Sequence, residues 1–199
     1  MRGCRVTAVT TVEELKMNAL VQAGASAQSG VVMNVVLEPT QYLTFMLGGE
    51  EYAIGILSIK EIIEYGGLTT VPMMPGTIRG VINLRGAVVP VMDLATRFGK
   101  VPSEVNKRTC IVIVELEASG ERQVLGVVVD SVNAVQEIAP ADIEPAPSFG
   151  MRIASDFIAG MGKVNGKFVI LLDIQQVLSM QDVDPLLALA PAAADAGAH

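Results

Sequence analysis

The side chains that most often carry enzyme chemistry are scarce in this sequence. Its single histidine is the final residue, His199, so no Ser–His–Asp or Cys–His arrangement can be assembled around it. The two cysteines, Cys4 and Cys110, lie far apart and do not form a pair at zinc-ligand spacing. A phosphate-binding G-x-x-x-x-G-K-[ST] loop and a dinucleotide-binding fingerprint are both missing. The sequence therefore predicts no metal site and no cofactor.

Carboxylate pairs are the remaining candidates for acid–base chemistry. Glu50 and Glu51 fall in a predicted turn, and Glu115 and Glu117 fall on one face of a predicted strand. Both placements are typical of solvated surface residues rather than of catalytic acids. We therefore expect a protein that is not an enzyme.

Composition narrows the class further. Hydrophobic residues make up 51% of the 199 residues, yet no apolar run approaches the roughly 20 residues that a membrane-spanning helix needs. Aromatic residues make up only 4%, and the net charge is −7, which argues against nucleic-acid binding through stacked bases or phosphates. Without a disulfide framework or an apolar leader, the sequence predicts a cytoplasmic protein with an aliphatic core.

The strongest structural signal is a hairpin over residues 78–94. Residues 81–84 and 87–92 are apolar and rich in β-formers, and Arg85-Gly86 between them supplies the turn. The same pattern returns at residues 158–174, a shift of 80, with Asn165-Gly166 at the turn. Residues 52–62 likewise align on residues 125–135, a shift of 73. The chain therefore contains two copies of one small β unit.

The remaining segments give the domain organisation. We expect a flexible extension with a short helix at residues 1–38 and a flexible tail at 182–199. Between them we predict one domain at 39–181, with a first barrel unit at about 41–100, a second at about 109–172 and a helix at 173–180. Asp93 is predicted to cap a short helix at 94–98.

Four motifs in the predicted domain closely resemble the CheW family of chemotaxis coupling proteins. They are F-x-L-G-x-E-E-Y at 45–52, I-L-x-I-x-E-I at 56–62, G-V-x-N-L-R-G at 80–86 and V-P-V-x-D-L at 89–94. The resemblance implies an all-β fold of two intertwined five-stranded SH3-like β barrels with short helices and a hydrophobic groove between them. Such a fold agrees with the two copies found from spacing.

The resemblance also implies a function and a set of contact residues. Members of the family are adaptors that link the cytoplasmic tips of methyl-accepting chemotaxis receptors to the histidine kinase CheA, in arrays beneath the inner membrane. The positions that match the family's receptor contacts are Ile59, Glu61, Ile62, Asn83 and Arg85. The kinase-binding segment falls on residues 143–149, with Ile143 and Phe149 as the predicted contacts.

Two departures from the family pattern stand out. Glu144 takes the place of a basic residue that relatives carry in the kinase-binding segment, which puts the array-closing contact in doubt. The N-terminal extension is also longer than the family needs.

Composition alone would assign Ile59 and Ile62 to the core and Glu61 to the solvated surface. Arg85 differs, because a guanidinium at a hairpin tip supports no core, and the second copy has the better turn former, Asn165, at the matching position. Two alternatives stay open for the function. The chain could couple a non-flagellar pathway, such as twitching motility or second-messenger control, or it could be a fragment of a larger signalling protein.

Overall fold

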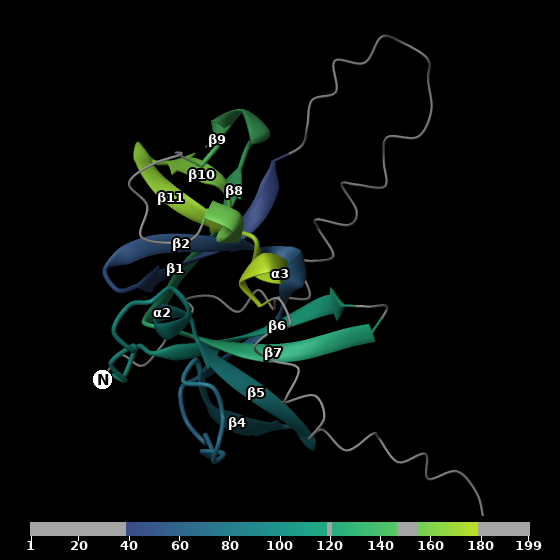
Figure 1. Ribbon diagram of the computed structural model, residues 1–199. Helices are drawn as coiled ribbons and strands as arrows, with labels where there is room; N and C mark the ends of the chain where they lie inside the picture. The colour runs from purple at the N-terminus through teal and green to yellow at the C-terminus, as the bar shows by residue number, and fades with distance from the viewer. Residues whose placement is uncertain (1–38, 119–120, 147–154, 179–199) are drawn as a thin grey trace, which may run out of the picture.

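Two β-sheets form the body of the protein. The computed structural model describes residues 39–118, 121–146 and 155–178 (Figure 1). The six-stranded sheet has the order β8-β1-β2-β11-β10-β9, and the five-stranded sheet has the order β3-β6-β7-β5-β4. No helix in these ranges is long and apolar enough to cross a membrane. The bounds are β1 Thr40–Leu47, β2 Glu50–Gly55, η1 Ile56–Ser58, β3 Ile59–Glu64, β4 Ile78–Leu84, β5 Ala87–Asp93, α2 Leu94–Arg97, β6 Cys110–Ala118, β7 Glu121–Val129, β8 Ser131–Ile138, η2 Pro140–Asp142, β9 Ile143–Glu144, η3 Ser155–Phe157, β10 Ile158–Val164, β11 Lys167–Leu172 and α3 Ile174–Val177.

The two sequence copies exchange strands between the sheets. The six-stranded sheet combines β1 and β2 of the first copy with β8, β10 and β11 of the second. The five-stranded sheet combines β6 and β7 of the second copy with β3, β4 and β5 of the first. The predicted all-β, intertwined fold is confirmed, but the units at 41–100 and 109–172 do not form separate sheets. One sheet also has a sixth strand, the two-residue β9.

Three apolar clusters explain how the sheets pack. The largest lies between the sheets and includes Phe45 and Tyr52 from one sheet and Val112 and Val127 from the other. The buried residues of a second cluster come from β4, β5, β6 and β7, and Ile63 of β3 packs against them, so the five-stranded sheet must curve around this cluster. A third, smaller cluster lies within the six-stranded sheet. β6 serves two clusters with alternate residues, which is why its apolar run shows no polar alternation.

The hairpins β4–β5 and β10–β11 are structural equivalents, as the shift of 80 predicted. Arg85 and Asn165 both have positive φ, at 52° and 49°, and each is followed by a glycine of positive φ. Two such residues in a row define the turn that matches the twist of a hairpin. Asp93 and Asp173 each accept two backbone N–H groups at the start of a short helix, α2 and α3. The predicted cap at Asp93 is therefore confirmed.

The structure describes the other predicted segments only in part. α3 covers Ile174–Val177 of the helix expected at 173–180, and residues 179 and 180 lie outside the described residues. The expected extension at 1–38, the tail at 182–199 and Phe149 also lie outside them.

Because Gly80 has no side chain, the segment around Thr69 can lie directly against β4. Thr69 and Val81 exchange two backbone hydrogen bonds of 2.8 and 2.9 Å, and a Cβ at Gly80 would collide with the carbonyl oxygen of Thr69. Gly80 also has a φ of +151°, which residues with a side chain rarely adopt. We expect Gly80→Ala to lower the free energy of unfolding by about 2–4 kcal/mol, measured by urea denaturation.

The matched control for this prediction is Gly55→Ala. Gly55 has a φ of −59°, and a Cβ added there would have no other atom within 4 Å, so its substitution should change stability by less than about 1 kcal/mol. Equal effects at the two glycines would contradict the proposed steric role of Gly80.

Candidate partner-binding site

An ion pair joins the two opposite edges of the five-stranded sheet. β3 and β4 are the first and last strands of that sheet, yet Arg85 Nη2 lies 2.9 Å from Glu61 Oε2. The sheet therefore curves until the β4–β5 turn comes within side-chain reach of β3, and we call the surface around Glu61 and Arg85 the seam. The Glu61 side chain is 24% exposed and that of Arg85 is 81% exposed, so the pair lies at the surface.

Local structure holds each member of this pair in place. Glu61 lies just after a register shift in the pairing of β3 with β6, between Ile59 and Glu61. Arg85 is the first residue of the β4–β5 turn, and Asn83 steadies that turn by accepting the Gly86 N–H at 2.8 Å. Asn83 is itself exposed and lies beside Arg85. Three of the five predicted receptor contacts, Glu61, Asn83 and Arg85, therefore come together at the seam.

The two predicted isoleucines have different environments. Ile62 is half-buried and packs on the cluster between the sheets. Ile59 is completely buried in the same cluster, with 0% exposure. Its side chain offers no surface to a partner, so the direct contact predicted for Ile59 does not fit this structure. What remains for Ile59 is a packing role that anchors the start of β3.

Two residues of β8 were not predicted as contacts. Val132 and Val135 are half-buried and pack on the same cluster as Ile62. They correspond to Ile59 and Ile62 in the other copy, at the shift of 73. That alignment could have identified them, because β3 and β8 are equivalent edge strands of the two sheets. Edge residues of an inter-sheet core are natural places for an apolar partner to pack.

The second copy shows that the fold does not require the ion pair. At the positions equivalent to Glu61 and Arg85 it has Ala134 and Asn165. The β10–β11 turn forms with the same backbone geometry around Asn165. A residue pair that one copy has and the other folds without is a candidate for binding rather than for stability.

Arg85→Asn tests this point directly. The change places at residue 85 the residue that the second copy uses, and Asn tolerates positive φ better than Arg does. Loss of an exposed ion pair costs about 0–1 kcal/mol, which the better turn residue offsets. We expect the free energy of unfolding to change by less than about 0.5 kcal/mol in urea denaturation. A loss above about 1.5 kcal/mol would make Arg85 a structural residue.

The predicted kinase-binding segment is only partly described. Ile143 is half-buried and packs on the cluster of the six-stranded sheet, and its Cγ2 would lie 2.8 Å from a Cβ at Gly160. Glu144, which pairs with Met161 of β10, is exposed. Phe149 lies outside the described residues, so the structure does not place the two predicted contacts side by side.

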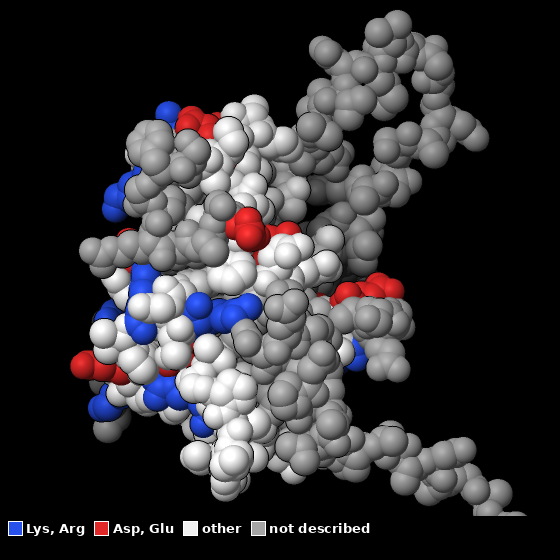
Figure 2. Space-filling model, in the orientation of Figure 1, with Lys and Arg blue, Asp and Glu red and all other residues white. Residues whose placement is uncertain are grey.

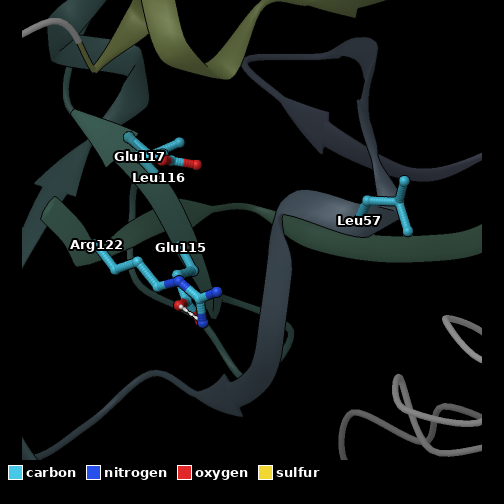
Figure 3. A pocket seen from close by; sticks show the side chains of 5 residues that line it. All are labelled: Leu57, Glu115, Leu116, Glu117 and Arg122. Atoms are coloured by element: carbon cyan, nitrogen blue, oxygen red, sulfur yellow. Dashed lines mark ion pairs between the residues drawn. The ribbon is translucent and has the colours of Figure 1, made fainter. Parts of the chain in front are cut away.

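A shallow pocket lies near the seam strand β3. Figure 3 shows its lining: Leu57 of η1 on one side and Glu115, Leu116, Glu117 and Arg122 of the β6–β7 hairpin on the other. Its volume is about 270 Å³. Glu115 forms ion pairs with Arg122 at 3.6 Å and with Lys60 at 3.4 Å. The Glu115 carboxylate is therefore shared between two cations at the edge of an open surface depression.

Charged side chains of both signs lie on the described surface. Figure 2 shows Lys and Arg side chains on the same face as Asp and Glu side chains, with broad uncharged areas between them. Within the described ranges, no group of three potential metal ligands is found.

Comparison with known proteins gives the family. The CheW-like domain model matches residues 41–182. The chain is 36% identical to the chemotaxis protein CheW of Klebsiella aerogenes, over 72% of this chain and 84% of that protein. It is 29% identical to the protein FrzA of Myxococcus xanthus, over 69% of this chain and 84% of FrzA.

A solved structure agrees with these sequence matches. The crystal structure of the scaffolding protein TtCheW from Thermoanaerobacter tengcongensis superposes with a TM-score of 0.65 at 31% identity, covering 77% of this chain and 96% of that one. Fold, motifs and sequence identity therefore agree, and the chain belongs to the CheW-like domain family.

Proposed function

We propose that the chain is a non-catalytic adaptor that couples methyl-accepting chemoreceptors to the histidine kinase CheA in bacterial chemosensory arrays. Its family membership supports this role, since a solved relative is a scaffolding protein. The observation that carries the proposal is the Glu61–Arg85 pair, which occurs at predicted receptor contacts and has no counterpart in the second copy.

The receptor-binding surface combines the seam with the apolar residues next to it. Ile62 supplies an apolar contact from β3, and Glu61 and Arg85 supply charges at its rim. A helix that lies on such a surface is held mainly by buried aliphatic contacts, while rim charges set its orientation. Val132 and Val135 of β8 would extend the apolar contact.

The kinase-binding surface is separate from the seam. It would use the segment that follows β8, with Ile143 and Phe149 as contacts. Ile143 belongs to the six-stranded sheet, whereas Glu61 and Arg85 belong to the five-stranded one. Two surfaces on two sheets would let one molecule hold both partners at once. In this role the protein works in the cytoplasm beneath the inner membrane and binds no nucleic acid.

Reconstitution tests the proposed role. A receptor cytoplasmic fragment is assembled on vesicles with CheA, and kinase activity is measured with and without the full chain. We expect the chain to raise kinase activity and to hydrolyse no ATP by itself. An unchanged kinase activity at saturating chain, or nucleotide turnover by the isolated chain, would overturn the proposal.

A second candidate keeps the adaptor role but changes the pathway. The chain would then be a coupling protein of a non-flagellar pathway, such as twitching motility or second-messenger control, and FrzA is among the relatives that carry another name. Affinity purification from the source cell discriminates between the two, because the receptors and the kinase that copurify identify the pathway.

A further inference from the structure

The tip of the β10–β11 hairpin exposes an aromatic side chain and two lysines. Phe168 is 53% exposed, one of few large apolar side chains among the described residues that face solvent. Lys163 is its direct cross-strand partner in the antiparallel register, and Lys167 precedes it in β11. Both lysines are exposed. Cross-strand partners share one face of a hairpin, so Lys163 and Phe168 present a common surface. Lys167 directly precedes Phe168 in the strand, so its position belongs to the opposite face, at the end of the hairpin.

These two lysines differ from most cations of the described surface. Lys60, Arg85, Lys100 and Arg122 all lie within 4 Å of a carboxylate. No carboxylate of the described residues lies at ion-pair distance from Lys163 or Lys167. In a chain of net charge −7, the hairpin tip is thus a local site of uncompensated positive charge.

The first copy shows that the fold does not demand this combination. The equivalent residues of the β4–β5 hairpin are Asn83, Ala87 and Val88, and that hairpin forms with the same register. Lysines alone could serve to block unwanted pairing at a sheet edge. An exposed phenylalanine beside them favours association instead, because it adds apolar surface on which another molecule can pack.

We propose that Lys163, Lys167 and Phe168 form a docking surface for an acidic protein segment that presents an apolar side chain between carboxylates. The apolar side chain would pack on the Phe168 ring, one carboxylate would pair with Lys163 on the same face, and a second would pair with Lys167 at the end of the hairpin. An aromatic anchor flanked by charges that set orientation is a common design of small interfaces. This surface lies on the other sheet from Glu61 and Arg85, so the proposal does not depend on the proposed receptor contact.

The neighbouring charges favour a narrow partner. Asp142 and Glu144 are exposed, and Glu144 pairs with Met161, two residues from Lys163 on β10. These carboxylates would repel a broad anionic surface such as a lipid bilayer. Two lysines contribute only about 1 kcal/mol each to binding such a surface. A single peptide strand can reach the lysines and Phe168 without covering the carboxylates.

Titration with a short synthetic peptide tests the proposal. The probe has Asp and Glu on both sides of one Leu, and its control has Asn and Gln in their place. The ¹H–¹⁵N spectrum of the full chain is followed during the titration. We expect the amide signals of residues 163–169 to shift with the acidic probe only. We also expect binding to weaken severalfold between roughly 0.05 and 0.5 M NaCl.

A variant in which the three surface residues are replaced by their equivalents from the first copy tests whether these side chains bind the probe. The triple variant Lys163→Asn, Lys167→Ala and Phe168→Val should keep the fold, since the β4–β5 hairpin folds with those residue types. We expect it to bind the acidic probe at least about tenfold more weakly, whereas Val88→Ala at the other tip should bind as before.

Several results would overturn the proposal. They are equal binding of both probes, shifts that map elsewhere, an unchanged affinity of the triple variant, or no binding at millimolar probe. Binding to phosphatidylglycerol vesicles in place of the probe would overturn it in favour of a membrane. Self-association that the triple variant abolishes, without probe binding, would overturn it in favour of a second copy of this chain.

Discussion

Asp93→Ala is expected to lower the free energy of unfolding by about 3–5 kcal/mol, the largest loss among the single substitutions considered. The Asp93 side chain is completely buried. Its Oδ2 accepts the Arg79 Nε–H at 2.8 Å and the Ser103 N–H at 3.3 Å, and its Oδ1 accepts two N–H groups at the start of α2. Removing the carboxylate takes the counter-ion from the partly buried Arg79 guanidinium, which keeps only the Ser103 carbonyl oxygen as an acceptor, and it leaves the buried Ser103 N–H without a partner. This costs more than the lost bonds were worth.

The second copy again supplies the control. Asp173 caps α3 through two backbone N–H groups at 3.0 and 3.1 Å. Residue 159 is alanine where the first copy has Arg79, and no arginine of the described residues pairs with Asp173. Asp173→Ala should therefore cost only the value of a helix cap, about 1 kcal/mol. Urea denaturation of the full chain measures both. A difference between the variants below about 1 kcal/mol would show that the Arg79–Asp93 pair adds little beyond capping.

Local features of the fold could be predicted from the sequence because they depend on neighbouring residues. The two hairpins, their turn residues and the cap at Asp93 each follow from a few adjacent side chains. The exchange of strands between sheets could not be predicted in this way. β6 and β7 pair with β3 and β5 of the other copy, and nothing local to β6 distinguishes that partner from β8. Only the family resemblance implied the intertwined arrangement.

The candidate site, too, could be predicted from the sequence only where it depends on neighbouring residues. Arg85 could be singled out because the second copy has Asn165 at the same turn position. The partner of Arg85 could not be found by inspection, since Glu61 lies on the opposite edge of the sheet and meets it only when the sheet curves. The family resemblance made Ile59 a receptor contact, whereas composition alone placed it in the core, where it is completely buried.

Arg85→Glu is expected to weaken receptor binding by about 1–3 kcal/mol, or roughly 5- to 150-fold. The substitution removes guanidinium donors at the rim of the apolar contact and puts a carboxylate beside Glu61. Because the Arg85 side chain is 81% exposed at a turn, stability should change by no more than about 0.5 kcal/mol. Titration against a receptor fragment measures the first effect. Titration against the regulatory domain of CheA should show unchanged affinity, because Ile143 and Phe149 are not altered.

Arg122→Glu is the matched control for that titration. Arg122 is also 81% exposed and also pairs with a half-buried glutamate, Glu115, which is 28% exposed. The two variants therefore change the same charge in nearly the same setting, but only one lies at the seam. If the receptor binds at the seam, the Arg122→Glu variant should bind the receptor fragment with the affinity of the unmodified chain. Equal losses in both variants would mean that the receptor senses overall charge and would remove Arg85 from the proposed contacts.

Exchanging the charges of Glu61 and Arg85 shows whether receptor binding depends on the ion pair itself or on the separate position of each charge. The double variant Glu61→Arg, Arg85→Glu keeps an ion pair across the seam, so it should retain any function that depends only on closing the sheet. If receptor affinity returns in the double variant, the pair acts by holding β3 and β4 together. If affinity stays low while urea denaturation shows an intact fold, the receptor contacts each charge separately. We expect the second result, because the second copy folds with Ala134 and Asn165 at the equivalent positions and without any such pair.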